Sequence, residues 1–509
     1  MRPIGRAGRG ILVKHVMLAL LLAAFGAPDV RAAIGQEGSA VRPKASAGRR
    51  AVPEDEPAGI DRERRLLDTA SAIEGDSGAY LVLRLLETGA LKDRDLRREG
   101  FEVVRVRMPD ASEPWPLACD IGTAESREAE RFGAMGHLRA DALTLRCRLA
   151  LEMVRSDRRA ARELLLELPP GVGVPADECR SFLMPTAEVF YETLPKVLAS
   201  SLTAGELRRG VKWEIARRYL AAVGTPLDIG AASAMITALE PPAEEIDLLV
   251  AQLTAAISKM PGSWRAIAQM AGNRGAGPRI EGLLERLGGR EAARRELRAA
   301  LRGLVERSLE APRCADAASD MTANVLEYFN AVVLADRPLA AADLEPPARG
   351  EAGVENRLYV SAASRRILTE IKELVHERPE AESDVIRAYD ACLAKVRDWS
   401  SVEERSDGDY VSQKAYILME LIRLAPDRSR RVDALSEYVA ITRHAKRAET
   451  PDGVLVVQAV FLLWRLDADD RRLVLEMLRA GGPPLLAAYA TLQLDGVDAF
   501  GIETPAGAR

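Results

Sequence analysis

Arginines recur on one predicted helix at a spacing that places their side chains on a single face. They stand four residues apart within 290–310 and form one stripe along that helix. The stripe consists of Arg290, Arg294, Arg298 and Arg302. A row of guanidinium groups suits an anionic partner, such as a phospholipid headgroup or an acidic protein face. A structural interpretation competes with this one, because arginine stems often cover the edge of a buried face and Glu291 and Glu296 neutralise part of the stripe.

A serine that could act as a nucleophile stands in Gly75-Asp76-Ser77-Gly78. This stretch resembles the nucleophile motif of chymotrypsin-like serine proteases, although Ala79-Tyr80 replaces the Gly-Pro that follows there. That chemistry needs a histidine base, which in those proteases precedes the serine. The one upstream histidine, His15, lies in a leader that we expect to be removed. Because Gly, Asp and Ser are the usual turn residues, we interpret the stretch as a turn between two helices.

Clustered carboxylates at Asp467, Asp469 and Asp470 suggest a cation site. A calcium loop that starts at Asp467 requires Asp or Asn at 471 and Gly at 472, and both positions hold arginine. We therefore place these acids at the start of a helix, where they oppose its positive end. The histidines beyond the leader are far apart in the sequence and predict no metal site; they are His137, His376 and His444. The sequence thus predicts no catalytic, cofactor-binding or metal-ligating residue.

The five cysteines divide into two groups. Cys147 and Cys392 lie inside apolar helical patterns and are predicted to be buried thiols. The others lie in polar or proline-rich connections, and we expect one disulfide among them, because an export compartment lets disulfides persist. These three are Cys119, Cys179 and Cys314. The sequence does not select the pair.

Residues 1–32 have the features of a cleaved secretory signal peptide. A basic start precedes the apolar stretch from Val16 to Ala27, and Val30-Arg31-Ala32 ends in a small residue at the expected cleavage site. A membrane anchor would need about 20 apolar residues, which this stretch does not reach. We expect an exported protein, periplasmic or extracellular, with no transmembrane segment after cleavage. The low lysine and asparagine content is typical of a bacterial gene with high GC content.

Charge disfavours nucleic acid as a partner. The full chain has a formal net charge of −5, and removal of the basic leader makes the mature chain more acidic. Polyanions are therefore poor partners for the protein as a whole. The 48% of hydrophobic residues is sufficient for one large domain or two ordinary ones.

From about residue 61 the apolar spacing predicts one helix after another. The clearest is 242–260, in which Ile246, Leu249, Val250, Leu253 and Ile257 mark one buried face. Thr203 and Glu206 form a capping box in front of a helix over 207–223. The other predicted helices are 62–73, 79–86, 137–154, 157–168, 182–200, 227–239, 290–310, 317–334, 358–377, 382–398, 409–425, 428–447, 453–466, 470–480 and 483–493. The best strand candidate, 101–108, fits a helix over 96–106 equally well.

Short links between helices that each carry an apolar stripe favour antiparallel hairpins. We therefore predict an all-α fold, an irregular α-solenoid or superhelix of helical hairpins. Its architecture resembles tetratricopeptide and HEAT arrays, but the spacing matches no consensus repeat. We divide the chain into a disordered spacer at 33–60, a helical-repeat region at 61–345, a C-terminal helical part at 346–495 and a flexible tail at 496–509.

The predicted architecture favours a non-catalytic exported scaffold that binds another protein in the cell envelope. Two other functions stay open. One is an envelope enzyme on a helical scaffold that acts on peptidoglycan or another glycan, which would need two carboxylates facing each other in a cleft. The other is a carrier of a lipid or apolar ligand in the bundle around Val454–Trp464, which is apolar on nearly every side.

Overall fold

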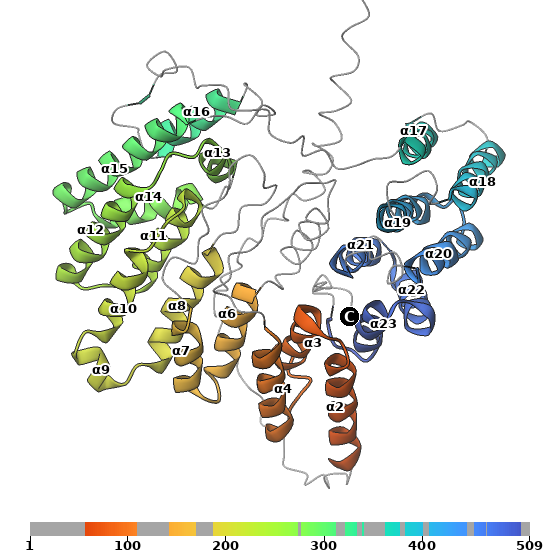
Figure 1. Ribbon diagram of the computed structural model, residues 1–509, viewed down its shortest axis with the longest axis horizontal. Helices are drawn as coiled ribbons and strands as arrows, with labels where there is room; N and C mark the ends of the chain where they lie inside the picture. The colour runs from red at the N-terminus through yellow and green to blue at the C-terminus, as the bar shows by residue number, and fades with distance from the viewer. Residues whose placement is uncertain are drawn as a thin grey trace, which may run out of the picture. The chain divides into compact units, whose positions relative to one another are not determined.

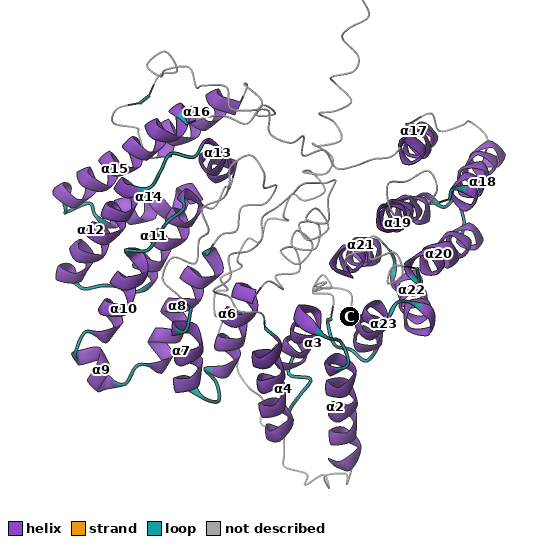
Figure 2. Cartoon of the chain, viewed as in Figure 1, coloured by secondary structure: helices purple, strands orange, loops and turns teal. Residues whose placement is uncertain are grey.

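The computed structural model describes residues 56–108, 142–168, 187–272, 276–311, 321–332, 338–339, 362–376, 382–400, 407–444, 452–464 and 466–499. The signal peptide, nearly all of the spacer, Cys119, Cys179, Cys314 and the predicted boundary at 345 lie outside these residues. The described residues form helices and turns, and none of them lies in a strand (Figures 1 and 2). The all-α class predicted from the sequence is therefore confirmed.

The first group of helices precedes residue 333. It comprises α2 (Glu56–Ser71), α3 (Gly75–Glu87), α4 (Arg94–Arg107), α6 (Ala142–Met153), α7 (Arg158–Leu166), α8 (Glu188–Ser201), α9 (Ala204–Arg208), α10 (Val211–Leu220), the 3-10 turn η1 (Pro226–Asp228), α11 (Ile229–Ala238), α12 (Ala243–Lys259), α13 (Trp264–Gly272), α14 (Ala276–Arg286), α15 (Glu291–Glu310) and α16 (Met321–Val332).

The second group follows residue 361. It comprises α17 (Ala362–His376), α18 (Glu382–Asp398), α19 (Asp407–Leu424), α20 (Arg428–Thr442), α21 (Asp452–Trp464), α22 (Ala468–Gly481) and α23 (Pro484–Leu494). In the described part of the chain, none of the helices combines the length and the hydrophobicity that crossing a bilayer requires.

Capping residues set several helix starts as the sequence predicts. At α9, the Thr203 side chain accepts from the Glu206 amide and the Glu206 carboxylate accepts from the Thr203 amide, which is the expected capping box. At α22, the Asp467 carboxylate accepts from the Asp470 amide at 2.9 Å. The acids at 467–470 thus stabilise a helix start.

Three local expectations need correction. The helix predicted over 207–223 is interrupted at Gly210, whose φ of 74° lies in the left-handed region and separates α9 from α10. The ambiguous segment 101–108 is helical except at its last residue, since α4 covers Arg94–Arg107. Ser77 lies in the first turn of α3 and not between helices.

Both ends of the packed region extend further than predicted. Helix α2 begins at Glu56, inside the segment expected to be a spacer. At the other end Val497 and Ala499 are buried, so Gly496–Ala499 is packed and is not a flexible tail. An apolar residue in a short polar segment gives no periodic signal, which is why the sequence pattern missed this segment.

Most of the described helices pack against their neighbours in two rows of contacts. The first row runs α17, α19, α21, α23 and continues with α3, α6, α8, α11, α14 and α16. The second row includes α20 with α22, α2 with α4, and α10, α12 and α15. Hairpin contacts such as α3 with α4, α19 with α20 and α22 with α23 join the rows. Helices α11, α12 and α13 contact α14, α15 and α16 respectively, so each of these contacts joins helices three apart along the chain. The predicted hairpins do not contain this spacing.

Ion pairs show that helices α18 and α20 run in the same direction. Arg430 on α20 pairs with Asp390 on α18 at 2.7 Å, and Arg397 on α18 pairs with Glu437 on α20 at 2.7 Å. Both pairs join residues 40 apart in the sequence. A constant separation at two points along the helices requires parallel axes. Arg431 on α20 then pairs with Asp470 on α22, with a separation of 39.

Two of the buried tyrosines differ in the hydrogen bonding of their hydroxyl groups. The Tyr219 hydroxyl donates to the Leu168 carbonyl at 2.9 Å, and Tyr219 is 1% exposed. The Tyr438 hydroxyl is fully buried and has no hydrogen-bond partner. Burial raises the pKa of Tyr438, so the group remains a neutral phenol. An unpaired buried hydroxyl lowers stability, whereas a paired one adds to it.

We predict opposite effects from two matched substitutions. Tyr438→Phe removes a hydroxyl that has no partner, and it should leave the free energy of unfolding unchanged or raise it. Tyr219→Phe removes a buried hydrogen bond and should lower the free energy of unfolding by about 1 kcal/mol. Denaturant titration of both variants measures the difference. Equal destabilisation by the two substitutions would contradict the assignment.

Candidate functional site

The arginine stripe lies along α15, and the structure places most of it among acidic partners. Arg290 is the N-cap of α15 and pairs with Asp247 on α12. Arg294 lies 3.7 Å from Glu291 on its own helix. Arg302 donates from Nε to Glu306 at 2.8 Å. The stripe therefore contributes to the α12–α15 contact as well as to the surface.

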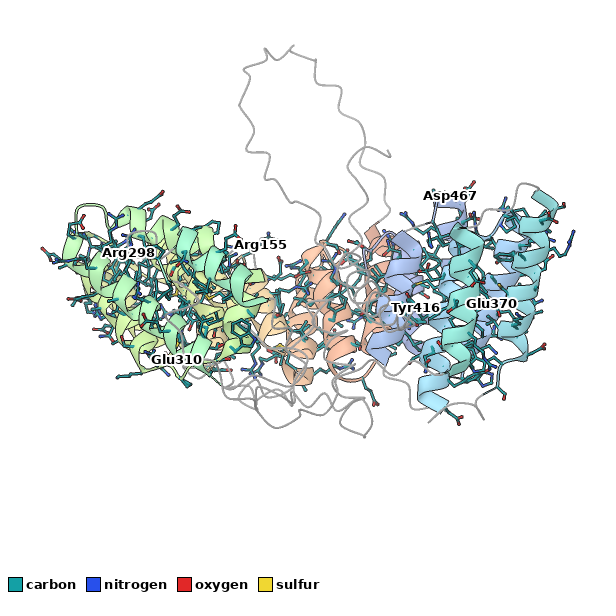
Figure 3. The ribbon with its side chains drawn as sticks, turned by 90° about the horizontal axis from the view of Figure 1, so that it is seen from above. Arg155, Arg298, Glu310, Glu370, Tyr416 and Asp467 are labelled. Carbon is teal, nitrogen blue, oxygen red and sulfur yellow. The ribbon has the colours of Figure 1, made fainter. Side chains whose placement is uncertain are left out.

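Partial burial distinguishes this stripe from a freely solvated one. The side chains of Arg290, Arg294 and Arg302 are 28%, 31% and 22% exposed. Arg298 projects from α15 (Figure 3), and burial lowers its pKa, with a further contribution from neighbouring Arg294. Stems that cover an apolar edge while their heads reach water explain this geometry. The sequence predicted the stripe, but not that α12 supplies one of its acidic partners.

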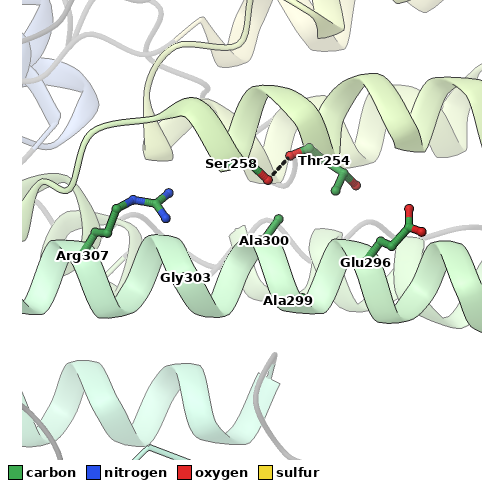
Figure 4. Close-up of a pocket in the computed structure, with 7 residues that line it drawn as sticks. All are labelled: Thr254, Ser258, Glu296, Ala299, Ala300, Gly303 and Arg307. Atoms are coloured by element: carbon green, nitrogen blue, oxygen red, sulfur yellow. Dashed lines mark hydrogen bonds between the residues drawn. The ribbon is translucent and has the colours of Figure 1, made fainter.

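A shallow groove lies between α12 and α15, on the side of α15 opposite the stripe (Figure 4). It has a volume of about 390 Å³. One wall is formed by Thr254 and Ser258 on α12, where the Ser258 hydroxyl donates to the Thr254 carbonyl at 2.9 Å. The opposite side belongs to α15 and consists of Glu296, Ala299, Ala300, Gly303 and Arg307. Small residues at its centre leave room for a side chain or backbone of a partner.

The two charged residues of the groove differ in what they bind. Arg307 donates to the Met260 and Ile257 carbonyls at 3.3 and 3.2 Å, and it thereby caps the C-terminus of α12. Glu296 is exposed on α15. The groove thus has a carboxylate near the N-terminal end of α15 and a structurally engaged guanidinium nearer its C-terminal end, without the converging polar groups of an enzyme site.

A carboxylate pair with divergent pKa values lies among arginines at the ends of α3 and α6. The Glu87 carboxylate accepts from Arg148 at 2.7 and 2.6 Å and from Arg84 at 3.0 Å. Burial acts to raise the pKa of Glu87, but the hydrogen bonds and charge of Arg148 outweigh it and lower the pKa. Burial raises the pKa of Glu152, against the nearby Arg155 charge.

Divergent pKa values are typical of acid–base pairs, but the contacts here point to a structural ion cluster. Both oxygens of Glu87 are occupied by guanidinium groups, so this carboxylate presents no free oxygen to a substrate. Glu152 pairs with Arg155 at 3.2 Å and with Arg97 at 3.7 Å. The sequence analysis missed this cluster. Arg84 and Glu87 stand at helical spacing, but Arg148 is 61 residues from Glu87.

The described residues contain no group of three or more His, Cys, Asp or Glu side chains arranged to hold a metal ion. Cys147 and Cys392 are buried, as predicted from the apolar patterns around them. Burial raises the pKa of the Cys392 thiol, which keeps it protonated and unreactive.

A buried carboxylate, Asp228, is the most strongly perturbed acid in the described core. Asp228 is 1% exposed and accepts from the Ala187 amide at 2.6 Å, at the start of α8. Burial raises its pKa to about 7, the Ala187 hydrogen bond opposes the shift, and the Glu188 charge adds to it. Among the described residues, no positively charged side chain contributes to this environment, so ionisation of Asp228 is unfavourable in the folded state.

No protein-family model, no characterised protein and no solved structure matches this chain. Its function has to be inferred from its own residues and contacts.

We predict that Asp228 makes the folded state less stable as pH rises. The pKa of Asp228 in the folded protein is about 7, above the ordinary 3.8. The stabilisation that Asp228 gives the folded state is therefore complete below pH 3.8 and is lost as pH rises to about 7. The slope reaches about 1.4 kcal/mol per pH unit in that window. Asp228→Asn should reduce this slope and stabilise the protein at pH 8. Thermal unfolding between pH 4 and 8 measures the effect.

Asp467→Asn serves as the control for this prediction. Asp467 is an exposed helix cap whose pKa is lowered by hydrogen bonds from the Asp470 and Asp469 amides. Its substitution should lower stability without removing the slope between pH 4 and 7. A wild-type protein whose stability does not fall across that range would contradict the assignment to Asp228.

Proposed function

We propose that the protein is a non-catalytic exported helical scaffold that binds another protein in the cell envelope. The observation that carries this proposal is that most of the described helices pack against their neighbours in two rows of contacts. An array in which each helix contacts only its neighbours presents a long surface to a partner instead of a single deep cavity. The partner is expected to be a protein, because such surfaces suit extended macromolecular contacts.

An α-solenoid is the finer architecture that we propose. The parallel helices α18 and α20 support it, and so does the Arg431–Asp470 pair between α20 and α22. These pairs join residues 40, 40 and 39 apart. In the first group, Arg290 on α15 pairs with Asp247 on α12 at a separation of 43. Near-constant separations are typical of stacked repeats, although no repeated sequence motif accompanies them.

The α12–α15 surface is the partner contact that we propose. The groove at Ala299, Ala300 and Gly303 and the arginine stripe lie on the same helix, on opposite sides of its buried face. Small residues permit close approach of a partner, and partly exposed guanidinium groups supply charge-assisted hydrogen bonds to carboxylates. An acidic protein face fits the stripe, and a small side chain of the same partner fits the groove.

Export is part of the proposal and rests on the sequence of residues 1–32. In a periplasmic or extracellular setting, a disulfide among Cys119, Cys179 and Cys314 would be stable. The contacts of the described residues are compatible with either setting.

The two other functions receive less support from the contacts. The carboxylates Glu87 and Glu152 are held by arginines, whereas glycoside hydrolysis needs carboxylates that are free to reach the substrate. The apolar helix α21 packs against α19 and α23, and its Gln458 amide donates to the Ser412 carbonyl at 3.1 Å. Its apolar sides are thus used at least in part in packing.

A pull-down from an envelope extract of the producing cell tests the binding proposal. The bait is the full chain, and the test variant changes Arg290, Arg294, Arg298 and Arg302 to glutamine. We expect wild type to enrich a protein partner and the variant to enrich it about tenfold less. A tenfold loss of affinity corresponds to about 1.4 kcal/mol of binding free energy.

The matched control changes four exposed arginines on other helices, each in a local ion pair: Arg98, Arg105, Arg159 and Arg472. This control should retain the partner. Circular dichroism establishes that all three proteins are equally helical. Equal enrichment by both variants would refute the α15 contact, and no enrichment by folded wild type would refute the scaffold function.

A further inference from the structure

The last described residues of the chain contact the first described helices, α2 and α3. Arg84 on α3 donates from Nε to the Asp498 carbonyl at 2.9 Å and from Nη2 to the Asp498 carboxylate at 2.9 Å. These atoms belong to residues 414 apart in the sequence. A two-point contact from one guanidinium to one residue fixes both position and orientation.

Two further contacts lie beside this pair. Arg62 on α2 donates to the Asp495 carbonyl at 2.5 Å. The rings of Tyr80 on α3 and Tyr489 on α23 stack with centroids 6.0 Å apart and planes 11° from parallel. Helix α2 also packs directly against α23. We call this set of contacts the seam.

The segment Asp495–Ala499 is shaped to reach the seam. Gly496 has a φ of 84°, in the left-handed region, and lets the chain turn after α23. The Val497 amide then donates to the Leu492 carbonyl at 2.9 Å, and the Ala499 amide donates to the Gln493 side chain at 3.0 Å. Val497 is 2% exposed, so the segment contributes apolar as well as polar contacts.

A chain of contacts continues from the seam into α6. Arg84 also pairs with Glu87, which binds Arg148 on α6 through both of its oxygens. The Arg148 guanidinium lies 5.2 Å from the centre of the Tyr80 ring. Asp498, Arg84, Glu87, Arg148, Tyr80 and Tyr489 thus form one continuous set of contacts.

We infer that Asp495–Ala499 acts as a latch that couples helices α17–α23 to α2–α16. The two groups are consecutive in the sequence, yet they meet where the end of the second contacts the beginning of the first. Release of the latch separates α23 from α2 and α3 while each group keeps its internal contacts. This inference does not depend on the proposed binding function.

Hydrogen exchange measured by mass spectrometry on the full chain tests the latch. Asp498→Asn removes the carboxylate from the Arg84 pair and should speed exchange about tenfold in α2, α3 and α23 while α12 and α15 are unaffected. Glu99→Gln is the matched control, since it removes the exposed Arg64–Glu99 pair at 2.7 Å on α2 and α4, away from the seam. The control should leave α23 protected.

A chain that ends at Leu494 provides the stronger perturbation. We expect it to stay helical, with exchange increased around the seam and two thermal transitions in place of one. Unchanged exchange in both the truncated chain and Asp498→Asn would overturn the latch. Loss of all helical signal on truncation would also overturn it, because the segment would then be part of one indivisible core.

Discussion

Helix α3 is buried on every side, and the packing of the helices around it depends on this burial. Tyr80, Leu81, Val82, Leu83, Leu85 and Leu86 are all 2% exposed or less. Successive residues of a helix point about 100° apart, so such a run presents apolar surface all around the axis. Water has to be excluded from each side, and α2, α4, α6 and α23 provide the cover. Helix α3 is thereby in contact with both α2 and α23.

Charged side chains then determine how helices align, while apolar burial supplies most of the stability. Pairs such as Arg397–Glu437 and Arg430–Asp390 are partly exposed, and pairs of this kind contribute at most about 1 kcal/mol each. These pairs instead fix the register of α18 against α20, because a shift of either helix along its axis would break both pairs. The arginine stripe of α15 has the same dual character, since Arg290 aligns α15 with α12 while the stripe reaches the surface.

The sequence predicted features that depend on local spacing. The regular apolar positions of 290–310 match α15 at Glu291–Glu310 almost residue for residue, and the capping box at Thr203 and Glu206 is present. Local spacing failed where one backbone conformation decides the outcome, as at Gly210. It could not reveal contacts such as Arg84–Asp498 or Glu87–Arg148, which join residues 414 and 61 apart, because no periodicity links them. The candidate site is thus half predicted: the stripe follows from the sequence, and the groove follows from the packing of α12 on α15.

Helix α3 is in contact with the segment that follows α23, and carbodiimide coupling of an Arg84→Lys variant is the most direct measurement of this contact. This zero-length reagent joins an amine to a carboxylate that it touches. We predict that mass spectrometry will find the amine at position 84 joined to Asp498 as well as to Glu87, which lies one helical turn away and serves as the internal control. Coupling to Glu87 without any coupling to Asp498 would show that residue 84 and Asp498 are not in contact.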